Sequence, residues 1–286
     1  MPDASVDCII TSPPYFRLRD YGVDGQLGLE THVDDWVREL RAVSRALQRV
    51  LVDKGTMWLN LGDTYSTHPS NGAARKSLVG APERLLLALI DDGWIVRNKV
   101  VWAKTNPMPT SVTDRLSTTY EVVYLLVKSP RYFFDLDAIR EPHRSLPAVA
   151  PRGVGKGVKY TGRRSPWLGP NSDGDSGLVT LKAAGRVGHP LGKNPGDVWR
   201  LSTARYKGAH FATFPETLVE RMIRAGCPPG GLILDPFMGA GTTAVVAERL
   251  GRDWVGIELS REFRDQAERR IEAARDTTTT KRKEVA

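Results

Sequence analysis

A short stretch, Ser12-Pro13-Pro14-Tyr15, combines residue types that could hold a planar base. It follows an apolar run over residues 6–10 that is typical of a buried strand in a parallel sheet. Two consecutive prolines fix φ twice and remove two backbone donors, so the chain is stiff there and offers carbonyl acceptors. Acceptors beside a stacking ring, at the carboxyl end of a strand, suit the exocyclic amino group of a base. A proline-rich turn with a half-buried tyrosine is the alternative interpretation.

A glycine-rich turn over residues 236–243 is the second stretch with chemical potential. A strand over 230–235 precedes it, a helix over 244–250 follows, and the next strand ends at Glu258. Glycines let the backbone approach a ligand, the helix N-terminus favours an anionic group, and Glu258 can accept both hydroxyls of a ribose. The loose pattern also fits a dinucleotide-binding turn, which makes a nicotinamide enzyme a competitor. Asp235, directly before the turn, would oppose a pyrophosphate but suits the ammonium and sulfonium groups of S-adenosylmethionine.

The elements that must position these stretches alternate between strands and helices. Besides those above, the patterns predict strands over 56–61, 93–102 and 120–127, and helices over 34–51, 82–92, 216–225 and 261–274. Gly55 is expected to end the helix over 34–51. Such alternation predicts an α/β fold with a doubly wound, mostly parallel sheet. Ligands bind such sheets at the carboxyl ends of strands, where both stretches lie.

Charge is concentrated in one segment of the 286-residue chain. The formal net charge is +8, and the segment 141–207 alone holds twelve Lys or Arg against four Asp or Glu. The segment is also rich in glycine and proline and carries aromatic residues such as Trp199. Basic residues interleaved with aromatic ones favour an anionic partner, which would order a segment that is otherwise loop-rich. A solvated loop is the alternative.

The composition excludes several other classes of protein. No apolar run approaches the roughly 20 residues of a membrane helix, and no signal peptide precedes the first strand. Cys8 and Cys227 are too far apart in the sequence to indicate a disulfide framework or a zinc site, so we expect no metal and two buried packing residues. A cytoplasmic location is the expectation.

Several motifs, taken in order, resemble one enzyme family. The chain is similar to the DNA amino-methyltransferases that make N4-methylcytosine or N6-methyladenine, in their circularly permuted β order. In that order the catalytic motif comes first, a target-recognition region follows, and the cofactor motif comes last. Ser12 to Tyr15 matches the first motif and 235–241 the last. Further similar stretches are 102–109, Asp114-Arg115, Tyr120-Glu121 and 210–215.

The resemblance implies a Rossmann-like class I S-adenosylmethionine-dependent methyltransferase fold with a loop-rich insert. It divides the chain into a catalytic half (1–140), a basic target-recognition insert (141–207), a cofactor-binding half (208–276) and a flexible tail (277–286). Relatives usually carry a further strand and helix before the catalytic strand, with a Gly-Asp in the adenosine pocket. This sequence starts close to its catalytic strand, so an open pocket with weak cofactor binding is one expectation and a start further upstream is the other.

The resemblance also assigns roles to individual residues. The catalytic residues are Ser12, Pro13, Pro14 and Tyr15. The residues implied to bind S-adenosylmethionine are Thr11, His210, Phe214, Asp235, Pro236, Phe237, Gly239, Gly241, Thr242, Thr243 and Glu258. The residues expected to contact double-stranded DNA are Lys104, Arg115, Arg152, Lys156, Lys159, Arg163, Arg164, Arg205 and Lys207.

The implied activity is methyl transfer to the amino group of a base flipped from the duplex. Serine before Pro-Pro-Tyr favours cytosine N4, with adenine N6 as the alternative from the same family. A nicotinamide oxidoreductase and a non-catalytic DNA-binding protein are the alternatives from other classes. Double-stranded DNA is the expected partner, a separately acting restriction endonuclease is a further one, and no oligomeric state is predicted.

Overall fold

The computed structural model describes residues 1–143, 189, 191–204 and 214–284. His210 and most of the basic residues expected to contact DNA therefore lie outside the described residues: Arg152, Lys156, Lys159, Arg163, Arg164, Arg205 and Lys207. Among the helices of the described ranges, none has the length and apolar character needed to cross a membrane.

The described residues form a mixed sheet in the order β5-β3-β4-β2-β1-β6-β7. Four neighbouring pairs are parallel, and β4 runs antiparallel to both β2 and β3. The predicted doubly wound, mostly parallel α/β sheet is confirmed. Its strands are β1 (Val6–Thr11), β2 (Leu51–Leu61), β3 (Ile95–Lys104), β4 (Tyr120–Val127), β5 (Val198–Leu201), β6 (Leu232–Asp235) and β7 (Asp253–Gly256).

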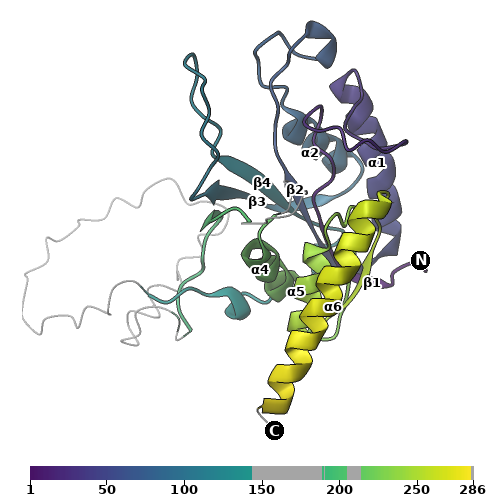
Figure 1. The fold of residues 1–286 in the computed structure, drawn as a ribbon, viewed down its shortest axis with the longest axis vertical. Helices are drawn as coiled ribbons and strands as arrows, with labels where there is room; N and C mark the ends of the chain where they lie inside the picture. Colours follow the sequence, from purple (N-terminus) through teal and green to yellow (C-terminus); the bar gives the residue numbers. More distant parts are fainter. Residues whose placement is uncertain (144–188, 190, 205–213, 285–286) are drawn as a thin grey trace, which may run out of the picture. The chain divides into compact units, whose positions relative to one another are not determined.

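Helices cover the sheet in two groups (Figure 1). In the first group, α1 and α2 bury apolar side chains against alternate residues of the central strands, among them Ile9 and Met57. In the second group, α4 packs on β1 and β2, and α5 lies between α4 and α6. The helices are α1 (Val33–Val50), α2 (Ala81–Asp91), α4 (Glu216–Gly226), α5 (Thr242–Leu250) and α6 (Arg261–Glu284), with 3-10 turns η1 (Pro69–Asn71) and η2 (Asp137–Ile139).

The chain separates into two compact units with boundaries that differ from the sequence prediction. One unit contains Met1–Ala138 and Gly196–Ala286, and the other contains Ile139–Pro195. The segment 141–207 therefore gives β5 to the main sheet, where β5 pairs in parallel with β3. Trp199 of β5 is buried at 3% exposure and packs beside Trp58, with ring centroids 6.0 Å apart. Its aromatic ring serves the core, so it does not support the interpretation of a DNA-reading surface.

Two element ends also differ from the prediction. Helix α1 ends at Val50, Leu51 is already extended, and Gly55 lies inside β2 instead of ending the helix. A Cβ on Gly55 would stand 2.5 Å from Leu51 Cδ1 and 2.9 Å from the Asp7 carbonyl oxygen, so the glycine permits close packing. Helix α6 continues to Glu284, past the predicted end at residue 274 and into the predicted tail.

Candidate active site

Strands β1 and β6 are neighbours in the sheet. Their pairing brings the Ser12–Tyr15 stretch close to the glycine-rich turn over residues 236–243. Their register pairs Cys8 with Ile233 and Ile9 with Leu234, so Thr11 and Asp235 end side by side. The Thr11 hydroxyl donates a hydrogen bond of 2.9 Å to Asp235 Oδ1. The residues that follow β1 and those that follow β6 therefore leave the sheet from one point.

Asp235 is the centre of a buried hydrogen-bond cluster. Thr243 Oγ1 donates to Asp235 Oδ2 at 2.6 Å, and the Phe237 backbone N–H donates to Oδ1 at 3.1 Å. Burial raises the pKa of Asp235 to about 6, although these donors oppose the rise. Thr11 and Thr243, both implied to bind the cofactor, are almost fully buried and act on Asp235. Internal donors hold both oxygens of Asp235. This carboxylate would therefore act on a bound ligand through its charge, across the turn, and not through a direct hydrogen bond.

The turn after β6 is held open by backbone geometry and by Glu258. Gly239 and Gly241 have φ values of +52° and +76°, a region that favours glycine. Glu258 accepts the Gly239 N–H at 2.7 Å and the Ser260 N–H at 2.8 Å. Each carboxylate oxygen of Glu258 keeps a further lone pair, and the residue is half-buried. Glu258 can therefore still accept hydrogen bonds from the hydroxyl groups of a ligand.

These residues suit the charged and polar groups of S-adenosylmethionine. Helix α5 begins at Thr242, and its N-cap, Gly241, supplies no side-chain hydrogen bond to the helix N-terminus. Uncapped N–H groups and the helix dipole favour a carboxylate. Pro236, Phe237 and Gly239 remain half-buried at the turn, whereas Thr242 is buried.

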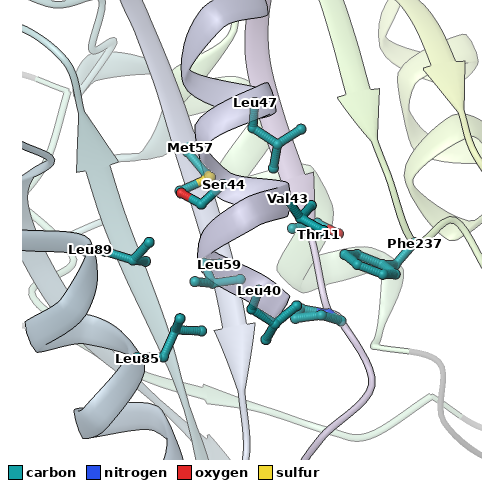
Figure 2. Close-up of a pocket in the computed structure, with 11 residues that line it drawn as sticks. Thr11, Leu40, Val43, Ser44, Leu47, Met57, Leu59, Leu85, Leu89 and Phe237 are labelled. Carbon is teal, nitrogen blue, oxygen red and sulfur yellow. The ribbon is translucent and has the colours of Figure 1, made fainter. Parts of the chain in front are cut away.

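A small apolar cavity lies behind the turn (Figure 2). Its volume is about 20 Å³, and it is lined by α1, α2, β1 and β2 together with Pro13 and Phe237. That volume holds about one water molecule and no nucleoside. We assign it to packing between the helices and the sheet, with Phe237 closing the end nearest the turn.

The Pro-Pro segment presents one free carbonyl acceptor among those of its two prolines. The Trp36 indole N–H donates to the Pro14 carbonyl at 3.0 Å, and Trp36 is fully buried. No hydrogen bond to the Pro13 carbonyl occurs within the described ranges. Pro13 is buried and its carbonyl has no partner among the described residues, while the carbonyl of Pro14 anchors the turn to α1.

A hydrogen-bond network surrounds the Tyr15 hydroxyl. This hydroxyl donates to Glu121 Oε2 at 2.6 Å and accepts from Asn60 Nδ2 at 2.6 Å and from Ser12 Oγ at 3.2 Å. Lys104 Nζ lies 2.6 Å from Glu121 Oε1. Burial and the negative charge of Glu121 raise the pKa of Tyr15 well above its usual value, so the phenol keeps its proton.

Comparison with known proteins decides the family. The model of the DNA methylase family that makes N6- or N4-methylated bases matches residues 6–269. This chain belongs to that family of DNA methylases. The type II methyltransferase M.SmaI of Serratia marcescens is 35% identical over 93% of this chain and 84% of its own length. M.Cfr9I of Citrobacter freundii is 36% identical over 95% of this chain and 83% of its own.

A solved structure shares the fold of this methylase. The PvuII DNA methyltransferase, described as cytosine-N4-specific, superposes with a TM-score of 0.64 at 18% identity, covering 98% of this chain and 86% of that one. The expected class I methyltransferase fold is confirmed. Membership of the methylase family also excludes the nicotinamide oxidoreductase considered from the sequence.

Lys104 and Arg115 are the two described residues that were expected to contact DNA in this methylase. Lys104 is paired with Glu121, and its side chain is 22% exposed. Arg115 is exposed, and its guanidinium lies 3.7 Å from the centre of the Tyr65 ring. The predicted DNA contacts of Arg115 and Lys104 both remain predictions, and Lys104 also has a partner within the site.

Glu121 and Asn60 are functional candidates that the sequence did not single out as site residues. Glu121 had appeared only as part of a similar stretch, and Asn60 lies inside an apolar strand. A polar residue in a buried run is a signal that could have found Asn60. Asn60 is 1% exposed, and its Oδ1 has no hydrogen-bond partner within the described part of the chain.

Phe214, whose contact with the cofactor remains a prediction, and the two cysteines are buried in this methylase. Phe214 is buried at 9% exposure before α4. Cys8 and Cys227 are fully buried, which confirms them as packing residues. Among the residues that the structure describes, no cluster of His, Cys, Asp or Glu is placed to hold a metal ion.

Gly62 shapes the seat of the Tyr15 ring, and replacing it should impair catalysis. A Cβ on Gly62 would meet Tyr15 Cε2 at 2.7 Å, a distance that side-chain carbons do not tolerate. We expect Gly62→Ala to displace the ring and lower the rate of methylation by about tenfold or more, since small misplacements have large effects on catalysis. Single-turnover kinetics would measure the change.

Gly231→Ala is a control for Gly62→Ala outside the site. Its added Cβ meets atoms at 3.0 Å near Cys227 and Pro228, before β6. Thermal unfolding of both variants would separate lost stability from lost turnover. A Gly62→Ala variant with wild-type turnover would show that the Tyr15 position is unimportant.

Proposed function

We propose that this chain transfers a methyl group from S-adenosylmethionine to the N4 amino group of a cytosine flipped out of double-stranded DNA. The observation that carries the proposal is the hydrogen bond between Thr11 and Asp235, which joins the base-binding stretch to the cofactor turn. Family membership establishes N4-cytosine or N6-adenine methylation of DNA. The choice of cytosine rests on Ser12 at the start of the Ser-Pro-Pro-Tyr motif.

The cofactor would lie along the turn after β6. Glu258 would accept the ribose hydroxyls, and the N-terminus of α5 would face the carboxylate of the amino-acid part. The half-buried Pro236, Phe237 and Gly239 would contact the cofactor directly. When bound, S-adenosylmethionine supplies an electrophilic methyl group on a positively charged sulfur.

The protein's task is to make the base amine a nucleophile. Its lone pair is delocalised into the ring, so acceptors that hold both N–H bonds favour the pyramidal nitrogen that can attack. We assign these acceptors to Ser12 Oγ and the Pro13 carbonyl, which also stabilise the positive charge that develops on nitrogen. Tyr15 would stack on the flipped base. The N–C bond would form as the C–S bond breaks, the neutral thioether would leave, and the methylated nitrogen would release a proton to water, so no covalent enzyme intermediate is needed.

The modified base identifies the reaction. The chain would be incubated with a mixed-sequence plasmid and S-adenosylmethionine, and the DNA hydrolysed to nucleosides for mass spectrometry. N4-methylcytosine supports the proposal, and N6-methyladenine overturns the choice of base. Ser12→Ala and Asp235→Ala serve as controls, because a non-catalytic DNA-binding protein would show no activity that depends on them. Calorimetric titration with S-adenosylmethionine would test whether binding is tight or weak.

We further propose that the basic segment 141–207 supplies the target-recognition contacts, most of them from the unit Ile139–Pro195. Its lysines and arginines would neutralise phosphates, and a few side chains would read base edges. A separately acting restriction endonuclease with the same target would be consistent with the type II relatives. The activity is proposed to be cytoplasmic.

A double variant tests the DNA contacts of this segment. We expect Arg163→Ala with Arg164→Ala to weaken DNA binding for all sequences and to reduce the slope of log K against log salt by about 2, one for each lost phosphate contact. Fluorescence anisotropy over a salt series would measure the slope. Arg38→Ala on α1, where Arg38 pairs with Asp35, is the matched control. An unchanged slope in the double variant would refute these contacts.

A further inference from the structure

We propose that Glu121 is a positioning residue that orients the hydroxyl protons of Tyr15 and Ser12, so that Ser12 presents lone pairs to the base amine. The inference rests on the proposed function and adds the device that makes Ser12 an acceptor. A neutral hydroxyl is both donor and acceptor. If the proton of Ser12 pointed at the base, it would repel the amine protons, so the site needs another place for it.

Glu121 fixes the first proton of the network. A carboxylate only accepts hydrogen bonds, and Glu121 Oε2 lies 2.6 Å from the Tyr15 hydroxyl oxygen. The Tyr15 proton therefore lies on the line to Glu121. The Lys104 ammonium, 2.6 Å from Glu121 Oε1, balances the charge of this carboxylate, whose side chain is only 16% exposed.

Asn60 fixes the role of the Tyr15 oxygen from the other side. Asn60 Nδ2 lies 2.6 Å from the Tyr15 oxygen and 2.8 Å from Glu121 Oε2. The reverse orientation of the amide would set Oδ1 against the carboxylate oxygen, so the network itself selects the donor orientation. Held between a carboxylate and an amide donor, the Tyr15 oxygen can only accept from further neighbours.

Ser12 is the last member of the network. Its Oγ lies 3.2 Å from the Tyr15 oxygen, which has no proton left to give. The Ser12 proton therefore points at Tyr15. Asn60 Nδ2 lies 3.4 Å from Ser12 Oγ and can donate weakly to one of its lone pairs, which leaves the other lone pair for the base amine. Ser12 becomes a pure acceptor at the end of β1, beside the free carbonyl of Pro13.

Two substitutions alter the orientation of the hydroxyl protons in this network while they keep side chains of nearly the same size. In Glu121→Gln, the amide oxygen faces Lys104 and the amide nitrogen replaces Oε2, so Tyr15 and Asn60 both lose their shared acceptor. The Tyr15 proton is then no longer held away from Ser12. We expect kcat to fall by about tenfold to a hundredfold, the effect of a charge-assisted hydrogen bond. In Tyr15→Phe, the ring can still stack, but Ser12 loses its acceptor, and kcat should fall by about threefold to tenfold. Cofactor and DNA dissociation constants should stay near wild type in both.

The double variant separates proton orientation from simple structural support. With no Tyr15 hydroxyl to misdirect, the Glu121→Gln change should have little further effect, so the double variant should have the kcat of Tyr15→Phe alone. Losses that multiply would overturn the proposal. Tyr132→Phe, which removes a hydroxyl that accepts from Arg97 outside this network, is the matched control and should have wild-type kcat.

Other outcomes are equally decisive. Wild-type kcat in Glu121→Gln or in Tyr15→Phe overturns the proposal. If Glu121→Gln does not fold, as judged by thermal unfolding, Tyr15→Phe decides alone. A wild-type chain that methylates adenine changes the proposed base and leaves this test in place, because the amine chemistry is the same. A wild-type chain that methylates neither base overturns both proposals.

Discussion

Ser12→Ala is expected to reduce kcat for methyl transfer by about a hundredfold or more, while the dissociation constant for S-adenosylmethionine changes little. The substitution removes one of two acceptors proposed to hold the base amine, and its effect should be confined to the step in which positive charge develops on nitrogen. The side chain is not needed for folding, because Ser12 is half-buried and its Oγ contacts only Tyr15 and Asn60 among the described residues. Single-turnover methylation and calorimetry would measure the two quantities.

Ser5→Ala is the matched control for Ser12→Ala. Ser5 precedes the opposite end of β1, and its hydroxyl donates to the Pro2 carbonyl. It should have wild-type turnover. If Ser12→Ala kept wild-type kcat, the acceptor role would be wrong; if it lost cofactor binding instead, Ser12 would belong to the cofactor site.

Cofactor affinity is expected to rise with pH through about 6, where Asp235 ionises. S-adenosylmethionine carries positive charge, which an ionised Asp235 favours and a protonated one does not. The stability of the cofactor-free protein should change with pH in the opposite direction. The pKa of Asp235 is higher in the folded state than its usual 3.8, so the folded state binds the extra proton. Stability should therefore be fully present below about pH 4 and fall between about pH 4 and pH 6, by about 3 kcal/mol.

Asp235→Asn should abolish both pH dependences. The amide oxygen can accept from Thr11 and Phe237, and the amide nitrogen can donate to Thr243 in place of the lost acceptor, so the fold is retained. We expect cofactor affinity to fall by about tenfold to a hundredfold above pH 6, as when a hydrogen-bonded charge is removed. Calorimetry and chemical unfolding over a pH series would measure these effects. A variant that kept the wild-type pH profile would show that another group titrates.

The features that could be predicted from the sequence are those that depend on residues close together along the chain. Proline and glycine spacing identified both site stretches, and apolar periodicity identified the central strands and helices. The sequence missed contacts between distant strands, because these depend on register. Lys104 was predicted only as a DNA contact, and its ion pair with Glu121 becomes visible only when β3 pairs with β4. In the same way, Asn60 acquires a role only because β2 lies between β1 and β4.

Composition alone gave an incomplete description of the segment 141–207, because one part of this segment belongs to the main sheet. The basic, glycine-rich stretch 141–207 looks uniform, yet β5 within it completes the edge of the sheet. Trp199 was counted as part of a nucleic-acid surface because aromatic residues recur there, and only its packing on Trp58 shows otherwise. Gly55 was taken for a helix end because glycine commonly has that role, whereas here it makes room for Leu51.

The central place of β1 has a consequence for how the protein is made. β1 needs β2 on one side and β6 on the other, and β6 begins only at Leu232. During synthesis, one edge of β1 therefore stays unpaired until most of the chain has left the ribosome. An exposed strand edge is a site for wrong pairing, and pairing between strands so distant in sequence is slow. The same late event joins Thr11 to Asp235, so the active site can form only after β6 has been made.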